Sequence, residues 1–249
     1  MELNFEDKVV LVTGGTRGIG KQIADDLYSL GANVLITGTQ LDEITLFNKE
    51  AYLIDNRRKY FQLDLLDSNS LDQFINNISA YKKIDCLVNN AGINRLNHIQ
   101  ESNLSDWNDM INVNLTAPYR LIKSVSPLMI NNKFGRIVNI ASIFGVISKE
   151  KRTIYSATKF GIHGLTVGSS NDLARHNILV NSVSPGFVLT DLTKKNLSTL
   201  EMNNLVSQIP IQRMAETNDI SNVVIFLLSN LNMYLTGQNI IVDGGFTNV

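Results

Sequence analysis

A short apolar strand, a glycine-rich turn and a helix follow one another near the amino terminus, and this order constrains the possible folds most strongly. Residues 9–12 read Val-Val-Leu-Val, a β-branched apolar run typical of a buried parallel strand. Residues 13–20 read Thr-Gly-Gly-Thr-Arg-Gly-Ile-Gly, and apolar residues then recur at helical spacing from Ile23 to Leu30. Such a turn brings backbone N–H groups and a helix amino terminus to a phosphate, so it predicts nucleotide binding. Its spacing, Gly-x-x-x-Gly-x-Gly, differs from Gly-x-Gly-x-x-Gly, and a tight turn without a ligand is the alternative.

The rest of the chain alternates short apolar runs with helical patterns, and no linker, repeat or low-complexity stretch interrupts it. Further strands are expected at residues 34–37, 60–63, 84–88, 136–140, 178–183 and 239–242. Such alternation predicts a parallel sheet that is covered by helices on both faces. We therefore expect residues 1–249 to form one α/β domain with a doubly wound, seven-stranded parallel sheet, the Rossmann fold.

Polar or glycine-containing motifs follow most of the predicted strands directly. After the glycine turn of the first strand come Asp64 after the third, Asn90 after the fourth, Ser142 after the fifth and Pro185-Gly186 after the sixth. Open parallel sheets bind ligands beyond the carboxyl ends of their strands. The motifs therefore predict one shared site at this edge.

Tyr155 and Lys159 are four residues apart, so on a helix their side chains lie on one face. A tyrosine with a pKa of about 10 is a poor acid or base at neutral pH unless a nearby positive charge favours its phenolate. The pair therefore suits proton transfer to a carbonyl oxygen. Taken alone, this spacing is weak evidence, because two unrelated surface residues of a helix can show it. The motifs that accompany the pair support a catalytic role.

Together these motifs resemble the short-chain dehydrogenase/reductase family in its single-domain form, from Lys8 to Gly245. The chain is most similar to the 3-oxoacyl-(acyl-carrier-protein) reductases and the sugar or polyol dehydrogenases near them. The motifs that carry the resemblance are Thr13-Gly14-x-x-x-Gly18-x-Gly20, Asp64, Asn89-Asn90-Ala91-Gly92, Asn114, Ser142, Tyr155-x-x-x-Lys159 and Pro185-Gly186.

The resemblance implies the roles of four catalytic residues. Ser142 would polarise the substrate carbonyl, and Tyr155 would exchange a proton with its oxygen. Lys159 would hold the nicotinamide ribose and lower the pKa of Tyr155. Asn114 would hold a proton-relaying water on its backbone carbonyl. A strand-end turn is the alternative for Ser142, and a helix cap or kink is the alternative for Asn114.

The resemblance also implies a cofactor site in which Asp64 accepts from the adenine amino group, unless it only caps the next helix. Asn90, Ala91 and Gly92 would line the adenosine ribose, and Val188 and Thr190 would lie near the nicotinamide carboxamide and the pyrophosphate. The full set expected to contact the cofactor is Gly14, Thr16, Arg17, Gly18, Ile19, Gly20, Thr37, Thr39, Asp64, Leu65, Asn90, Ala91, Gly92, Tyr155, Lys159, Pro185, Gly186, Val188 and Thr190.

The region after the second predicted strand favours NADP. An NAD-specific site places an acidic residue there to bind the ribose 2′-hydroxyl, but residues 37–40 read Thr-Gly-Thr-Gln. Arg17 within the glycine turn supplies a planar cation that can pair with a 2′-phosphate. We expect NADPH to be preferred, although Arg17 is also compatible with NAD.

Residues 187–213 are the least regular part of the chain, with Thr190, Asp191, Lys194 and Lys195 followed by an amphipathic segment at about 200–209. The resemblance places a mobile substrate lid here, and loops at this edge commonly gate a site. An ordinary surface loop is the alternative.

The substrate is expected to be a small carbonyl compound or alcohol. Reductases that act on acyl carrier proteins present two basic residues to the carrier; here the first corresponds to Lys133, whereas the second falls at Asn171, beside Asp172. This departure weakens the thioester interpretation relative to a sugar or polyol. The charged run 149–152 is either a contact for a polar or anionic substrate or a solvated loop. A nucleotide-binding regulator without catalysis and a purely structural protein are the remaining alternatives.

Composition narrows the partners further. A net charge of −1 gives no general attraction to nucleic acid or to an anionic membrane, and no apolar run is long enough to span one. The first eight residues lack the blocks of a signal peptide. Cys86 is the only cysteine, which fits a reducing cytoplasm, and the three histidines show no metal-ligand spacing. We expect a cytoplasmic protein without a metal site.

Three glycines in the predicted catalytic helix suggest a close backbone contact. Gly161, Gly164 and Gly168 lie on one stripe, and interior glycine costs a helix about 1 kcal/mol relative to alanine. The contact is either with the helical region 107–129 of the same chain or with another subunit. In the resembling family this helix pairs with its copy, and residues 243–246 form a second two-fold contact, which together imply a homotetramer.

Overall fold

A computed structural model describes residues 3–190, 193 and 198–248. Asp191, Lys194 and Lys195, which were expected in the lid, lie outside the described residues.

Seven parallel strands form one sheet in the order β3-β2-β1-β4-β5-β6-β7, which confirms the doubly wound Rossmann fold. The strands are β1 (Val9–Val12), β2 (Asn33–Gly38), β3 (Arg58–Gln62), β4 (Cys86–Asn89), β5 (Gly135–Ile140), β6 (Ile178–Pro185) and β7 (Asn239–Val242). Several expected boundaries were wrong. Strand β2 is one residue longer at each end, β5 begins one residue earlier and β6 continues to Pro185. Strand β3 begins two residues earlier and ends one residue earlier, and β4 begins only at Cys86 and ends at Asn89. Ile84 and Asp85 are buried below that strand, so their apolar surroundings gave the same pattern as a strand.

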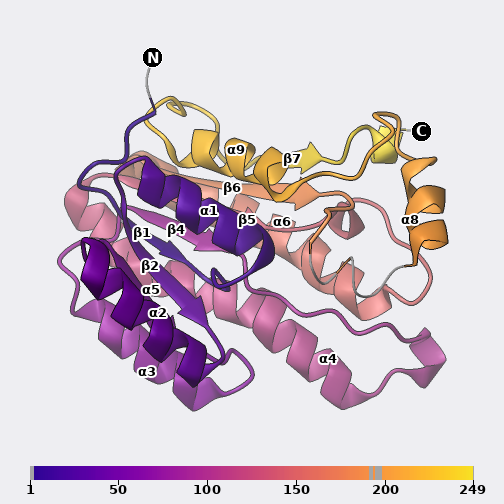
Figure 1. The fold of residues 1–249 in the computed structure, drawn as a ribbon, viewed down its shortest axis with the longest axis horizontal. Coiled ribbons are helices and arrows are strands. Elements are labelled where there is room, and N and C mark those ends of the chain that lie inside the picture. Colours follow the sequence, from indigo (N-terminus) through magenta and orange to yellow (C-terminus); the bar gives the residue numbers. More distant parts are fainter. Residues whose placement is uncertain (1–2, 191–192, 194–197, 249) are drawn as a thin grey trace.

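Helices connect the strands and cover both faces of the sheet (Figure 1). They are α1 (Gly18–Ser29), α2 (Leu41–Ile54), α3 (Ser68–Ser79), α4 (Leu104–Ile111), α5 (Ala117–Asn132), α6 (Thr153–Leu173), α8 (Thr199–Val206) and α9 (Thr217–Leu228). A π-helical turn, η2 (Asn112–Thr116), joins α4 to α5, and the short 3₁₀ turns are η1 (Ile99–Glu101), η3 (Ile143–Gly145), η4 (Ala174–His176) and η5 (Phe246–Asn248).

Strand β1 shows why the sheet is buried on both faces. Val10 and Val12 pack with α1 and α9 in one core, whereas Leu11 packs with α3 and α5 in the other. Successive side chains of a strand point to opposite faces, so a continuous apolar run is needed where both faces are covered.

The chain reverses its winding between β1 and β4, which are neighbours in the sheet. Val12 pairs with Ile36 of β2 on one side and with Val88 of β4 on the other. The connections leave these strands in opposite directions, and this opens a crevice at their carboxyl ends. The fold therefore places the glycine turn and the Asn90 loop side by side.

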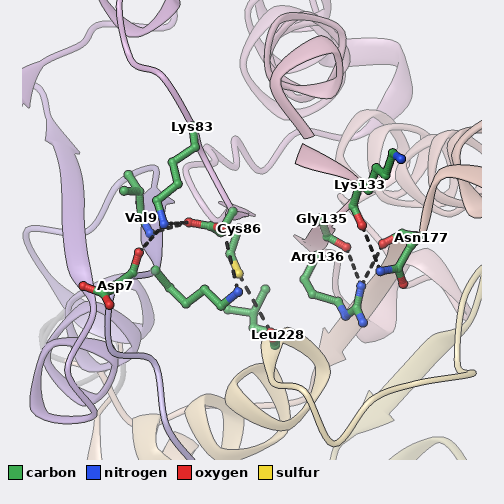
Figure 2. A network of polar contacts seen from close by, with 11 residues as sticks. Asp7, Val9, Lys83, Cys86, Lys133, Gly135, Arg136, Asn177 and Leu228 are labelled. Atoms are coloured by element: carbon green, nitrogen blue, oxygen red, sulfur yellow. Dashed lines mark hydrogen bonds and ion pairs between the residues drawn. The ribbon is translucent and has the colours of Figure 1, made fainter. Parts of the chain in front are cut away.

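The opposite, amino edge of the sheet is closed by polar contacts (Figure 2). Asp85 accepts a hydrogen bond from the Val9 backbone at 2.8 Å and lies 3.5 Å from the Lys83 ammonium. The buried Arg136 guanidinium donates to the backbone carbonyls of Asn177 at 3.0 Å and Asn232 at 3.2 Å. Carbonyls thus satisfy the two terminal nitrogens of this buried cation, while its Nε has no hydrogen-bond partner among the described residues.

Cys86 lies in the same region and is fully buried (Figure 2). Burial raises the pKa of its thiol to about 12. A thiol that is kept protonated away from solvent is unreactive.

Candidate active site

The glycine turn is held against β4 by hydrogen bonds from Asn90. Its side-chain amide donates to the backbone carbonyls of Thr13 at 2.9 Å and Gly14 at 3.0 Å. The Thr13 hydroxyl accepts in return from the backbone N–H groups of Asn90 and Ala91. These contacts fix the turn across the β1–β4 crevice. The sequence analysis named Thr13 in the glycine motif but gave it no role, and the structure shows that its hydroxyl supports the turn.

Glycine is required at the turn for conformation and for space. Gly14 and Gly18 have φ angles of 61° and 56°, which side chains rarely adopt. A Cβ at Gly20 would lie 2.3 Å from the Asn90 amide nitrogen and 2.4 Å from the Gly14 carbonyl oxygen. The backbone therefore passes closer to itself here than any other residue would allow.

Within the described residues, the amino terminus of α1 has no side-chain cap and can receive an anion. Arg17 precedes the helix without capping it through its side chain, and the first turn contains no acidic residue. The Thr190 methyl lies close to Gly18, 3.7 Å from the position of an added Cβ. Uncapped N–H groups beside a glycine turn fit the pyrophosphate of a dinucleotide, with Ile19, Gly20 and Thr190 around it.

The residues expected at the adenosine end divide into buried and exposed groups. Thr37 is buried, and its hydroxyl accepts from the Gly14 backbone at 3.2 Å, so it supports the turn from below. Arg17 and Thr39 are exposed at the rim, while the side chain of Thr16 packs on Gly38. The exposed side chains are the ones that can reach a ribose or its phosphate.

Asp64 does not cap the following helix. Its carboxylate accepts from the Leu66 backbone at 2.9 Å, whereas Asp67 caps α3 by accepting from Asn69. The alternative reading of Asp64 as the helix cap was therefore wrong. Leu65 beside it is buried in the core.

Pro185 and Gly186 end β6 next to the carboxyl-terminal segment. The Gly186 backbone donates to Val242 at 2.9 Å, and an added Cβ there would lie 2.8 Å from Asp243. Val188, which is buried, continues the chain through an isolated bridge to Ala215. These contacts hold the segment against the carboxyl-terminal part of the chain, and its last described residue before the gap, Thr190, reaches Gly18 of the glycine turn.

Ser142 follows β5 and begins a short 3₁₀ turn. Its hydroxyl accepts from the Phe144 backbone at 3.1 Å, as the turn interpretation predicted. The same hydroxyl counteracts the effect of burial on the pKa of Tyr155. A turn serine can therefore also face the Tyr155 phenol.

Tyr155 lies in the first turn of α6, half-buried, with its ring edge-on to Phe144 at 6.4 Å between centroids. Burial raises the pKa of the phenol; Ser142 and the Arg152 charge oppose that shift. A pKa below the ordinary value had been expected from the charge of Lys159, but desolvation by burial outweighs the Ser142 hydrogen bond and the Arg152 charge, so the pKa of Tyr155 is raised.

Lys159 is buried, and its ammonium donates to the Ile140 backbone carbonyl at 2.9 Å. Burial lowers its pKa to about 8. The ammonium also lies near Gly92, in ordinary contact range at 3.7 Å from the position of an added Cβ. Gly92 itself is exposed, which leaves a path from Lys159 to a bound ribose.

Asn114 lies in the π-helical turn and is buried. Its side chain exchanges two hydrogen bonds of 2.9 Å with the Ile93 backbone and donates to Thr158 at 3.1 Å. It thereby joins the loop after β4 to α6. π-Turns within helices frequently mark functional sites.

The described part of residues 187–213 contains α8, whose side chains are all at least partly exposed. Ser198 and Glu201 form a reciprocal capping box at its start. The expected amphipathic segment is thus a helix, though it ends at Val206, three residues early.

Sequence reasoning had not selected Phe144 and Phe187, and it had not separated Arg152 from its charged neighbours. Phe144 packs edge-on against both Tyr155 and Phe187, and Phe187 packs against Phe246. These rings form a wall beside the phenol. Their positions two residues after Ser142 and one after Gly186 were the available signal.

Among the described residues, no three His, Cys, Asp or Glu side chains gather as metal ligands would. Within the same residues, no helix has the length and apolar character needed to cross a membrane.

Comparison with known proteins identifies the family. A family model described as short chain dehydrogenase matches residues 8–201. The chain is 39% identical over 247 residues to the 3-oxoacyl-[acyl-carrier-protein] reductase FabG of Aquifex aeolicus, with 98% of this chain and 99% of the relative covered. It is 36% identical over 244 residues to the FabG of Escherichia coli K12, covering 98% of both.

Solved structures agree with this assignment. The gluconate 5-dehydrogenase of Burkholderia cenocepacia in complex with NADP and tartrate superposes with a TM-score of 0.92 at 27% identity, covering 99% of this chain and 98% of that one. ElxO with NADP bound superposes with a TM-score of 0.89 at 31% identity, covering 97% and 99%. The chain belongs to the short-chain dehydrogenase family and is an NAD(P)-dependent oxidoreductase.

Proposed function

We propose that this enzyme interconverts a carbonyl and a secondary alcohol with NADP(H), and that Tyr155 is its general acid and base. The arrangement of Tyr155 beside Ser142, with the Lys159 ammonium 5.6 Å from the centre of its ring, carries this proposal. A catalytically silent regulator would not need a half-buried tyrosine beside a buried lysine. We infer that one domain holds both cofactor and substrate.

The nicotinamide supplies or accepts the hydride when it is bound. During reduction the Ser142 hydroxyl donates to the substrate carbonyl oxygen and polarises it. As the carbonyl carbon gains the hydride, the Tyr155 O–H bond breaks and its proton passes to that oxygen, which leaves a phenolate and an alcohol. Lys159 stabilises the phenolate by its charge, and oxidation reverses each transfer. Asn114 positions the loop and the helix around these groups.

The cofactor is proposed to be NADPH in preference to NADH. Arg17 and Thr39 are exposed beside the uncapped amino terminus of α1, and β2 is followed by Thr39-Gln40 in place of an acidic residue. A guanidinium there can pair with the 2′-phosphate. The NADP complexes of similar structures support this choice.

A 3-oxoacyl thioester is one candidate substrate. It is supported by the FabG relatives, which match almost the full chain. Lys133 is exposed and can meet an acidic carrier, but Asn171 is uncharged beside Asp172. Lys133 and Asn171 both lie toward the amino edge of the sheet, where the Asn177 side chain donates to the Lys133 carbonyl. Tyr155 lies toward the opposite edge.

A sugar, a sugar acid or a polyol is the second candidate. It is supported by the gluconate 5-dehydrogenase structure, which covers nearly the whole chain. An assay of NADPH oxidation and NADP reduction with 3-oxoacyl thioesters, sugars, sugar acids and polyols tests both candidates. Turnover of none of these carbonyls and alcohols with either cofactor would refute the proposed function.

A homotetramer is the proposed assembly. One exposed face of α6, here called the α6 stripe, consists of Phe160, Gly164, Val167 and Gly168. Phe160 is 48% exposed and Val167 is 37% exposed. An added Cβ at either glycine would meet nothing within 4 Å, while one at Gly161 would touch Leu115 at 3.0 Å. Packing within the chain explains Gly161 only, so a second subunit is the proposed partner of the other two.

A further inference from the structure

Arg152 stands apart from the charged run that contains it. Lys149, Glu150 and Lys151 are exposed to solvent, whereas Arg152 is half-buried. It directly precedes α6, and its backbone carbonyl accepts from Ser156 at 2.7 Å, so the start of the catalytic helix fixes its position. The sequence alone left this run as either a substrate contact or a solvated loop, and the structure separates one member from the other three.

The Arg152 guanidinium lies against the aromatic wall of the active site. Its central carbon is 4.9 Å from the centre of the Phe144 ring and 5.9 Å from the centre of the Tyr155 ring. Phe144 is only 7% exposed and is itself held edge-on by Phe187 at 6.5 Å. A rigid aromatic surface therefore orients a planar cation beside the catalytic phenol.

This cation has no carboxylate partner among the residues that the structure describes. Five other arginines do have one: Arg57, Arg58, Arg95, Arg120 and Arg213 each pair with an aspartate. The buried Arg136 has none either, but it donates to backbone carbonyls. Burial lowers the pKa of Arg152, as expected for a guanidinium that has lost water without gaining a counter-charge. Such a group is costly to the folded protein alone and becomes favourable when an anion binds.

We propose that Arg152 binds a carboxylate of the substrate, so that the site takes small oxo acids and the corresponding hydroxy acids. This inference rests on the proposed function, because Tyr155 must meet the carbonyl of the same molecule. The fork of a guanidinium matches a carboxylate with two parallel hydrogen bonds. Since Arg152 and Tyr155 are close neighbours, only a few bonds separate the carboxylate from the reacting carbon.

Matched substrates test this specificity. Each oxo acid of a short series, with the carboxylate placed progressively farther from the carbonyl, is assayed beside its own methyl ester. The wild-type enzyme is expected to favour the acid. In Arg152→Gln, kcat/KM for the acid should fall about 10- to 100-fold, mainly through KM, because a hydrogen-bonded charge pair is lost. The value for the ester should change less than about threefold, within the range of a lost neutral contact.

Two controls separate this role from a structural one. Lys151→Gln removes the adjacent, exposed charge and should leave the ratio of acid to ester unchanged. Arg152→Met keeps a long side chain on Phe144 without the charge, so it should reproduce the loss if Arg152→Gln folds poorly. Melting temperature and NADPH affinity verify that each variant is intact.

The outcomes distinguish this inference from the proposed function. Equal loss for acid and ester in both Arg152 variants would overturn the carboxylate role and leave the reaction class intact. Turnover of thioesters or neutral polyols, with none of any oxo acid, would do the same. Absence of turnover with every carbonyl substrate would refute the proposed function itself.

Discussion

The Lys159 ammonium lies 5.6 Å from the centre of the Tyr155 ring while it donates to the Ile140 backbone carbonyl at 2.9 Å. The carbonyl belongs to the last residue of β5, so the strand that presents Ser142 also holds the lysine. One helix and one strand end thus position all three groups. Because an ammonium has three donor hydrogens, the bond to Ile140 leaves others for a ribose hydroxyl.

Replacing Tyr155 with Phe should abolish proton transfer and preserve the cofactor site. The ring and its packing on Phe144 remain, while the transferable proton is removed. We expect kcat to fall about 10²- to 10⁴-fold, the usual contribution of a general acid or base. NADPH affinity, measured by fluorescence titration, should stay nearly constant. Activity within about threefold of wild type would exclude Tyr155 as the acid, and Tyr119→Phe on the exposed face of α5 is the matched control.

Lys159 should make stability depend on pH in a defined window. Its pKa is lowered from the ordinary 10.5 to about 8, so between these values the unfolded chain binds more protons than the folded one. Stability contributed by this group therefore rises from pH 8 toward 10.5 and is independent of pH below 8. From pH 8 to 10.5, the unfolding free energy of the wild-type protein should rise by about 3 kcal/mol relative to that of Lys159→Met.

Urea unfolding at several pH values measures that difference, and Lys123→Met controls for the loss of an exposed ammonium. The lowered pKa would be contradicted if the wild-type protein gained no stability relative to the variant between pH 8 and 10, or lost some.

The strand pattern allowed the fold to be predicted from the sequence because both faces of the sheet are buried. Runs such as residues 9–12 are apolar throughout, and each was followed by a turn or a helical pattern. Boundaries were less certain where buried residues continue beyond the strand, as at Ile84 and Asp85. Burial determines how far the apolar pattern extends in the sequence, whereas the backbone hydrogen bonds to the neighbouring strands determine where the strand begins and ends.

The candidate site was predictable where a motif depends on local spacing. Tyr155 and Lys159 share a helix face, and the glycine turn is continuous in sequence. Contacts between distant segments left no such signal: Thr13 with Asn90, or Phe144 with Phe187, meet only through the parallel sheet. The pKa of Tyr155 depends on burial by several segments, which explains why charge spacing alone gave the wrong direction.

The substitution Arg17→Ala should weaken the use of NADPH as cofactor more than that of NADH. The exposed guanidinium can pair with a 2′-phosphate that only NADPH carries, and charge-assisted hydrogen bonds contribute about 1.5–3 kcal/mol. We expect kcat/KM with NADPH to fall about 10- to 100-fold and that with NADH to change little. Arg175→Ala, exposed at the far end of α6, is the control. Equal efficiency with both cofactors in the wild type would overturn the preference.

Gly20→Ala should disturb the turn even though alanine favours a helix. Its Cβ would lie 2.4 Å from the Gly14 carbonyl oxygen, and this atom belongs to backbone that cannot rotate away. We expect a loss of about 1–3 kcal/mol in unfolding free energy, the range for overpacked sites, together with weaker cofactor binding. Lys21→Ala, at the next and exposed position, should have neither effect in denaturation and titration experiments.

The α6 stripe should bury itself against another subunit. Sedimentation at micromolar protein concentration is expected to show a species near four times the chain mass of 27.7 kDa. Gly164 faces open space within its own chain, so Gly164→Arg should leave the fold of the subunit intact while it places a charge in the two-fold contact. The variant should sediment as a smaller species, since a D₂ tetramer depends on two different two-fold contacts and one would remain.

Asn76→Arg, exposed on α3, should keep the full assembly. A fully active wild-type monomer would return Gly164 and Gly168 to an ordinary solvent-exposed helix surface, whereas loss of assembly in the Gly164 variant alone would locate the contact on α6.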